Sequence, residues 1–309
     1  MGVDPSSLGS GPSRSGPNAT LGFLVLRHLR VFFHNRNAVI LVGGAPLVLF
    51  LLFLVIIRPQ MATWFSATTG VSLIVPDDLA AAFSAWVFAS VAVISAVSST
   101  AGFLLAWIDD KKNDRFELQL ASGVRDWQLT GGYLLAAVVV STGVSYGVIV
   151  LGQIWALIAG QPLMPLMGWL ASLGAVLLAA VLFTGLNGFA LTFTGSVRAV
   201  GVYLVLMVVV IVFLANCLLN PVPGAELRLA NLLPFAQAAA LVRQPVVAPG
   251  LQPFRDPVLA QVRSFLSARI QVGDGRVWPV PVVVASLLVW STLFLTMAWM
   301  RLSQAVRRR

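Results

Sequence analysis

The sequence predicts an all-α polytopic membrane protein with six transmembrane helices. Hydrophobic residues make up 58% of the 309-residue chain and charged residues 10%, whereas a soluble domain carries about 25% charged residues. Six apolar segments reach the length of about 20 residues that a helix needs to cross the hydrocarbon core. None of the six contains Asp, Glu, Lys, Arg or His. A membrane-spanning barrel would show shorter segments of alternating hydrophobicity.

The chain before the first apolar segment divides into two parts. Residues 1–20 are rich in Gly, Ser and Pro, which predicts a disordered cytoplasmic tail. Residues 21–36 predict an amphipathic helix lying in the membrane interface. Its apolar side would carry Val25, Leu26, Leu29, Phe32 and Phe33, and its polar side Arg27, Arg30 and His34. The alternative is a longer first spanning helix with a basic start.

The rest of the chain, up to residue 309, forms a single transmembrane domain with the interfacial helix. The six spans are expected at about residues 38–57, 80–108, 129–159, 164–193, 199–219 and 280–300. Residues 220–278 form a proline-rich outer segment, in which the apolar stretch Leu232–Leu241 is too short to cross the bilayer. This pattern predicts a short outer helical hairpin that turns at Pro234. Asp256 and Pro257 then favour a further helix start.

The positions of the basic residues predict the orientation. Arginine and lysine concentrate in the cytoplasmic connections of membrane proteins. With the N-terminus inside, thirteen of the twenty basic residues fall on one side: Arg14, Arg27, Arg30, Arg36, Lys111, Lys112, Arg115, Arg125, Arg198, Arg301, Arg307, Arg308 and Arg309. We therefore expect a multi-pass protein of the cytoplasmic membrane with both termini in the cytoplasm. The arginines of the outer segment would then face the opposite side, where they could meet acidic headgroups or lipid phosphates.

Several functional classes lack the residues they would need. The chain has no phosphate-binding loop of the G-x-x-x-x-G-K-[ST] type, since its two lysines, Lys111 and Lys112, follow no glycine loop. No ionisable residue lies within a span, which argues against an ion-coupled carrier. His28 and His34 stand apart from any cysteine or carboxylate cluster, so we expect interfacial side chains there, not metal ligands or catalytic bases. Dispersed basic residues do not favour nucleic-acid binding. No catalytic, cofactor-binding or metal-binding residue is expected.

The connection between the second and third spans, Asp109–Trp127, differs from the other connections. It holds many of the acidic residues of the chain next to four basic ones, and Phe116, Leu118 and Leu120 alternate with the polar side chains. Charge mixing of this kind is usual in a solvated loop. A short charged helix with exposed apolar residues can also dock into a cleft of a partner protein.

Within this connection, residues 117–133 resemble the loop after the second span of type-2 ABC-exporter permeases, including the daunorubicin-resistance-like group. In that family a charged run is followed by Leu-Glu-x-Leu-Leu-x-Thr-Pro-Val-Ser-Arg and, further on, by Gly-Lys. The matching residues here are Glu117, Leu120, Ser122, Gly123, Val124, Arg125 and Gly132. The sequence departs from the pattern at Gly123, where proline is usual, and at Tyr133, where lysine is usual. Asn231-Leu-Leu-Pro-Phe and Gln237–Arg243 resemble the short outer helices of the family.

The resemblance implies the membrane-spanning subunit of an ATP-driven exporter of hydrophobic or amphipathic molecules: drug-like compounds, lipids or glycolipids. A separate ATPase subunit would bind ATP and Mg²⁺, and a second permease subunit, identical or similar, would complete a dimer among membrane lipids. The helix that couples ATPase and spans would comprise Arg115, Phe116, Glu117, Leu118, Leu120, Ser122, Gly123, Val124 and Arg125. The interfacial helix with Arg27, Arg30 and His34 would brace this joint. An ion-coupled secondary transporter and a non-transporting membrane anchor or immunity subunit are the alternatives.

Overall fold

The computed structural model of the chain describes residues 17–52, 55–56, 60, 63, 76–194, 196–215, 231–256, 258–268, 270–272 and 276–307. In these ranges the chain is almost entirely helical, which confirms the predicted class in its coarse form. The predicted tail ran too far, because the first helix begins at Pro17, and proline is favoured in the first turn of a helix. Residues 1–16 lie outside the described part.

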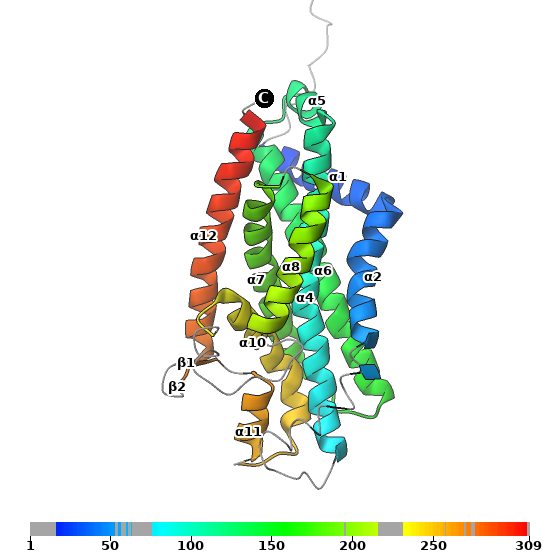
Figure 1. The fold of residues 1–309 in the computed structure, drawn as a ribbon, viewed down its shortest axis with the longest axis vertical. Coiled ribbons are helices and arrows are strands. Elements are labelled where there is room, and N and C mark those ends of the chain that lie inside the picture. The colour runs from blue at the N-terminus through cyan, green and yellow to red at the C-terminus, as the bar shows by residue number, and fades with distance from the viewer. Residues whose placement is uncertain are drawn as a thin grey trace, which may run out of the picture.

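The described elements form one elongated helical bundle (Figure 1). In chain order they are α1 (Pro17–His34), α2 (Arg36–Leu52), α4 (Pro76–Lys112), α5 (Arg115–Ala121), α6 (Asp126–Ile158), α7 (Leu166–Leu191), α8 (Val197–Leu214), α10 (Pro234–Val247), the 3₁₀ turn η3 (Ala248–Leu251), α11 (Val258–Phe265), β1 (Gln271–Val272), β2 (Arg276–Val277) and α12 (Val280–Arg307). We call the two ends of the bundle the α5 end and the α11 end.

Four of these helices are long and apolar enough to cross a membrane: Leu79–Lys112, Asp126–Ile158, Leu166–Leu191 and Val280–Arg307. They coincide with four of the six predicted spans. Three of them extend past a predicted boundary and include charged residues. A 37-residue helix such as α4 measures about 55 Å, well over the roughly 30 Å of hydrocarbon. Its charged last turn therefore continues the helix beyond the apolar zone.

The other two predicted spans correspond to shorter helices. The first corresponds to α2, which has 17 residues and is followed by residues that lie largely outside the described part. The fifth corresponds to α8, whose apolar stretch Arg198–Leu214 is also short, and residues 216–230 after it are not described. The count of six spans thus stays a prediction.

The chain breaks between the interfacial helix and the first predicted span. α1 ends at His34, Asn35 is not helical, and α2 begins at Arg36. Figure 1 shows α1 running across the α5 end of the bundle, while α2 runs along the bundle. A single longer first helix, the alternative left open by the sequence, is not what the described residues form.

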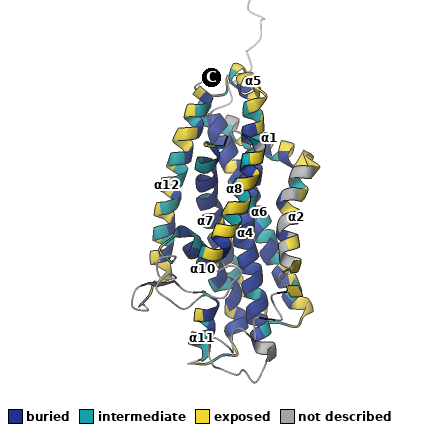
Figure 2. Cartoon of the chain, in the orientation of Figure 1, coloured by how far each residue is buried: buried dark blue, intermediate teal, exposed yellow. Residues whose placement is uncertain are grey.

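Helix α4 lies at the centre of the bundle. It packs against α2, α6, α7, α8 and α10, and it is buried along nearly its whole length (Figure 2). By contrast, α8 and α12 each keep one apolar face exposed, with Val205 and Phe213 on α8 and Val289 on α12 among the exposed side chains. Continuous apolar outer faces on helices that satisfy their own backbone are what lipid as a solvent requires.

The outer segment inserts a helix into the bundle. Pro234 occupies the first turn of α10, where its missing N–H costs no hydrogen bond. Residues 216–230 before this helix lie outside the described part, so the predicted hairpin stays a prediction. α10 packs on α4, α7 and α12 and is buried over most of its length. After η3 and α11, the antiparallel ribbon of β1 and β2 leads into α12. This ribbon was not expected, because two-residue strands leave no periodic pattern in a sequence.

The helix order gathers the predicted cytoplasmic residues at one end. α4, α7 and α12 end at the α5 end of the bundle, and α6 and α8 begin there. Lys112, Arg125, Arg198 and Arg307 therefore share this end, while α11, with Arg263, lies at the other. The side of the membrane that each end faces stays a prediction.

The contact between α7 and α12 requires a glycine. A Cβ atom at Gly185 would lie 2.7 Å from the backbone nitrogen of Leu295, too close for any side chain. We expect Gly185→Val to lower the free energy of unfolding by about 1–3 kcal/mol. Gly174→Ala on the same helix, with open space at its Cβ, is the control. Equal thermal unfolding midpoints for the two variants would contradict this packing.

Candidate functional site

The stretch predicted as a coupling helix contains a separate short helix, α5, just after the end of α4, and Ser122–Arg125 lie beyond its end. Its coupling role stays a prediction. Asp114 before it adopts a left-handed conformation, with φ of 53°, which Asp tolerates better than most residues. Gly123 after it has φ of +85°, and its N–H donates to the Leu120 carbonyl at 2.9 Å. A left-handed glycine is a usual helix end. It also explains the departure from the family pattern, because proline cannot adopt a positive φ.

Helix α5 is anchored on one side and exposed on the other. Phe116 is 1% exposed, with its ring centroid 5.6 Å from that of Trp107 and 6.1 Å from that of Tyr133. Leu118 is 73% exposed, and Glu117 is exposed beside it. Leu120 is half-buried against the same core as Phe116. The three predicted apolar residues therefore differ in burial. Phe116 anchors the helix in the core, Leu118 faces outward, and Leu120 is partly buried and partly exposed.

A polar chain ties α5 to the ends of α4 and α6. Arg115 Nη1 lies 2.9 Å from Asp110 Oδ1, and the Tyr133 hydroxyl donates to Asp110 Oδ2. The ion pair alone contributes little, since Arg115 is half exposed and surface pairs stabilise by about 0–1 kcal/mol. The buried tyrosine adds a bond between α6 and α4. Tyr133 thus has a structural role at the position where the family pattern has lysine.

Helix α1 lies over this joint and buries a face that the sequence did not predict. Leu24, His28 and Phe32 form the buried stripe, spaced at i, i+4 and i+8. The His28 ring stacks on the Tyr133 ring at a centroid distance of 3.9 Å. The approach is close because position 132 is glycine, where a Cβ would lie 3.2 Å from Leu24 Cβ.

The remaining α1 predictions are partly right. Arg30 and His34 are exposed, as expected for the polar side, and Arg27 is half-buried. Leu26 and Phe33, expected with the apolar side, are exposed. The expectation of an interfacial His28 is wrong, because the stacking on Tyr133 draws the ring into the bundle. A histidine at one helical turn from Leu24 and from Phe32 was the signal that could have indicated this.

The two predicted elements meet in one groove. A cavity of about 420 Å³ between α1 and α5 is lined by Phe23, Leu24, Arg27, Arg115, Leu118, Gln119, Ser122 and Val124. Arg125 lies just beyond it and is exposed; its N–H donates to Gln128 Oε1 at 3.0 Å and starts α6. We call this feature the α1–α5 groove. It combines exposed apolar side chains with the two arginines of its rim.

Burial at this joint gives stability a pH dependence. Burial, with a smaller contribution from Arg27, lowers the pKa of His28 from 6.5 to about 4, and Asp110 opposes the shift. The unfolded chain therefore takes up this proton near pH 6.5, and the folded chain only near pH 4. Stability is complete above pH 6.5 and is lost as the pH falls towards 4. We expect a loss of about 2 kcal/mol between pH 7.5 and pH 5.

Thermal unfolding of the purified protein at these two pH values checks this expectation. His28→Gln should show a smaller difference between pH 7.5 and pH 5 than the unchanged protein. His34→Gln, which changes the exposed histidine at the end of the same helix, should keep the full difference. An unchanged pH dependence in His28→Gln would rule out His28 as its source.

Deeper in the bundle, polar side chains bridge four helices. Asn187 on α7 donates to the Val97 carbonyl on α4 at 3.0 Å and accepts from the Tyr203 hydroxyl on α8 at 2.6 Å. Ser141 Oγ on α6 donates to the Ala96 carbonyl at 3.0 Å. Such bonds hold spans together in the absence of water. Within the described ranges, no group of His, Cys, Asp and Glu side chains is placed to hold a metal ion.

Helix α10 contributes a buried arginine to the bundle. Arg243 on α10 is 1% exposed; its Nη2 donates to Ser90 Oγ at 3.2 Å, and its guanidinium lies 5.4 Å from the Trp86 ring centroid. The sequence placed Arg243 on the outer surface, because a helix inserted between spans cannot be distinguished from an outer loop by composition. Arg243 instead joins α10 to α4.

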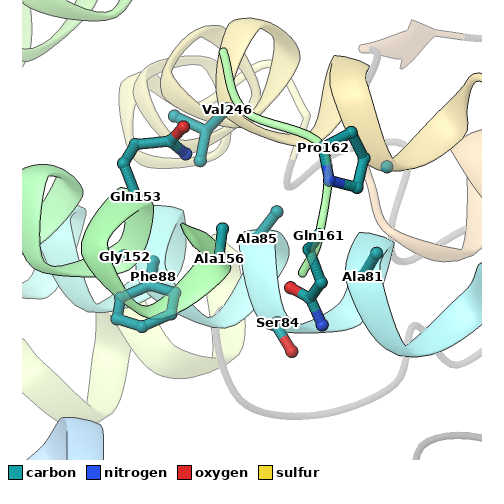
Figure 3. A pocket seen from close by; sticks show the side chains of 11 residues that line it. Ala81, Ser84, Ala85, Phe88, Gly152, Gln153, Ala156, Gln161, Pro162 and Val246 are labelled. Atoms are coloured by element: carbon teal, nitrogen blue, oxygen red, sulfur yellow. The ribbon is translucent and has the colours of Figure 1, made fainter. Parts of the chain in front are cut away.

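A second, much smaller cavity lies between α4, α6 and η3 near the α11 end. Figure 3 shows Ser84, Phe88, Gln153 and Gln161 among the side chains around it. Gln153 Oε1 accepts the Met164 N–H at 2.8 Å. The volume of about 10 Å³ has room for about one water molecule. It is too small for a transported substrate.

A scan against protein-family models and a search of the curated proteins found no match to this chain. The resemblance to exporter permeases therefore depends on the residues quoted above and on the order of the elements.

Proposed function

We propose that this chain is the membrane-spanning subunit of an ATP-driven exporter of the type-2 ABC family. It moves a hydrophobic or amphipathic substrate across the cytoplasmic membrane, and a separate ATPase subunit binds ATP and Mg²⁺. Two such subunits form a dimer, and the α5 end faces the cytoplasm. α5 is the helix that docks on the ATPase.

One observation carries this proposal: Leu118 is exposed on a short helix that is anchored in the core of the bundle. A single exposed leucine is ordinary on a soluble protein. Here, however, Phe116 holds the helix in the core, and the Arg115–Asp110–Tyr133 chain fixes its start. The α1–α5 groove continues the same surface with Phe23, also exposed. An exposed leucine on an anchored helix, next to a groove, is suited to transmit the movement of a bound partner to the bundle. A mobile loop could not transmit it.

The polar side chains that the described spans bury support the same proposal. The described spans bury serine, threonine, asparagine and glutamine, and the one buried arginine, Arg243, is held by Ser90 and Trp86. Proton- or ion-coupled carriers use carboxylates or histidines in their spans. Energy for transport would therefore come from another subunit.

ATP hydrolysis tests the proposal. The purified chain alone is expected to hydrolyse no ATP above background. The same chain purified with its ATPase subunit is expected to hydrolyse ATP, and an added amphipathic substrate should stimulate the rate. Hydrolysis of ATP by the contaminant-free chain would contradict the assignment of hydrolysis to a separate subunit. Substrate movement driven by an ion gradient without ATP would favour a secondary transporter.

A further inference from the structure

A cavity somewhat larger than the α1–α5 groove is separate from it in most of its lining. It has a volume of about 490 Å³ and lies between α1, α2, α4 and α6 at the α5 end. This volume is in the range of small-molecule sites, about 300–1,000 Å³. It shares Arg27 and Arg115 with the groove. We call it the α1–α4 cavity.

The cavity changes from charged to apolar along α4. Asp109 and Asp110 line its outer part, and Ala106, Phe103 and Gly102 follow inward on the same helix. The seven helical steps from Gly102 to Asp109 cover about 10 Å. Val42 of α2 and Phe32 of α1 complete the apolar part. The charged part lies where α4 leaves the apolar zone, so the cavity has the polarity of a lipid headgroup followed by the start of its chains.

The charges of the cavity are balanced, and two of them are available. Asp110 is engaged by Arg115 and by the Tyr133 hydroxyl. Arg27 and Asp109 line the same cavity, yet neither forms an ion pair within the described part of the chain. One cation and one anion thus line the same cavity without an ion pair between them. A ligand that carries both a negative and a positive group would satisfy both.

We infer that the α1–α4 cavity binds one zwitterionic amphiphile, with a phosphate at Arg27, an amine at Asp109, and acyl chains beginning along Phe103 and Gly102. Phosphatidylethanolamine of the membrane leaflet at the α5 end has this chemistry. An arginine fork suits phosphate oxygens, and a primary ammonium donates hydrogen bonds to a carboxylate. Basic pockets between spanning helices are a known mode of headgroup binding; the carboxylate adds selection for the amine. Binding does not depend on the proposed transport.

The test is native mass spectrometry of the purified chain, without any ATPase subunit, titrated with dioleoyl phosphatidylethanolamine. One bound lipid is expected. Arg27→Gln and Asp109→Asn should each weaken it about tenfold, the usual effect of losing one charge-assisted hydrogen bond. Arg30→Gln, one turn along the exposed side of α1, and Asp114→Asn, in the turn before α5, should bind as the unchanged protein does.

Two further probes separate the headgroup charges from the chains. Dioleoyl phosphatidylglycerol has the phosphate but no amine, so Arg27→Gln should weaken it while Asp109→Asn should not. Phosphoethanolamine, the headgroup without chains, should not displace the lipid at equal concentration. Ala106→Phe should fill the cavity and prevent binding of the lipid. Ala171→Phe, on an exposed face of α7, should leave binding unchanged.

Three results would overturn the inference. In the first, Arg27→Gln and Arg30→Gln bind phosphatidylethanolamine equally well. In the second, Asp109→Asn weakens both lipids alike, which would mean that Asp109 does not recognise the amine. In the third, phosphoethanolamine displaces the lipid, which would show a site for a soluble headgroup.

Discussion

Replacing Phe116 with alanine is expected to lower the free energy of unfolding by about 3–5 kcal/mol, the usual range for a fully buried phenylalanine. Phe116 of α5 packs between Trp107 of α4 and Tyr133 of α6. Its loss leaves a cavity at the point where α1, α4, α5 and α6 meet. α5 would then be held by the half-buried Leu120, the buried Gln119 and the half-exposed ion pair of Arg115.

Thermal unfolding of purified variants measures this loss. Leu118→Ala is the matched control: it lies two residues away on the same helix, and its side chain is 73% exposed. It should change stability by no more than about 0.5 kcal/mol. If Phe116→Ala unfolded at the same temperature as Leu118→Ala, α5 would not be anchored as described.

The second large effect concerns binding of the ATPase subunit. Here Leu118→Ala should have a large effect, although it hardly changes the stability of the chain. If Leu118 is buried in the complex, Leu118→Ala removes roughly 1–3 kcal/mol of contact energy, which is about five- to more than a hundredfold in affinity. Glu117→Lys should weaken capture further, because an unpaired charge at an interface is costly to bury. Neither change should alter the unfolding of the chain alone.

Co-purification of the ATPase subunit with each variant measures the effect. Leu170→Ala, an exposed leucine near the start of α7 and far from α5, controls for loss of a lipid-facing side chain. Leu120→Ala is a poorer probe, because Leu120 packs partly in the core and would change both stability and capture. Normal yields with Leu118→Ala and Glu117→Lys together would show that α5 is a solvated loop helix.

Sequence reasoning located the elements of this site better than the faces that they bury. Long uninterrupted apolar runs predict helices well, and four of the predicted spans correspond to helices of spanning length. The short helix at Arg115 was also expected. But a seven-residue helix is too short for periodicity to separate Phe116 from Leu118, and the structure places one in the core and the other outside.

The residues that sequence reasoning missed make contacts over long distances in the chain. Tyr133 was noted as a departure from a pattern. Its bond to Asp110 depends on how α6 packs on α4, and its stacking on His28 depends on how α1 crosses α6. Arg243 was assigned to an outer segment because composition does not show that α10 enters the bundle. By contrast, Gly123 could have been understood from local chemistry, since a glycine after a short helix favours a left-handed end.

The most direct test of the central claim is transport by the reconstituted complex. The chain and its ATPase subunit are placed in proteoliposomes with a fluorescent amphiphile, and its movement across the bilayer is followed after addition of ATP and Mg²⁺. We expect ATP-dependent movement that stops in Leu118→Ala and Glu117→Lys and continues in Leu170→Ala. Movement that is independent of ATP, or equal in all three variants, would contradict the assignment of this chain as an exporter subunit coupled through α5.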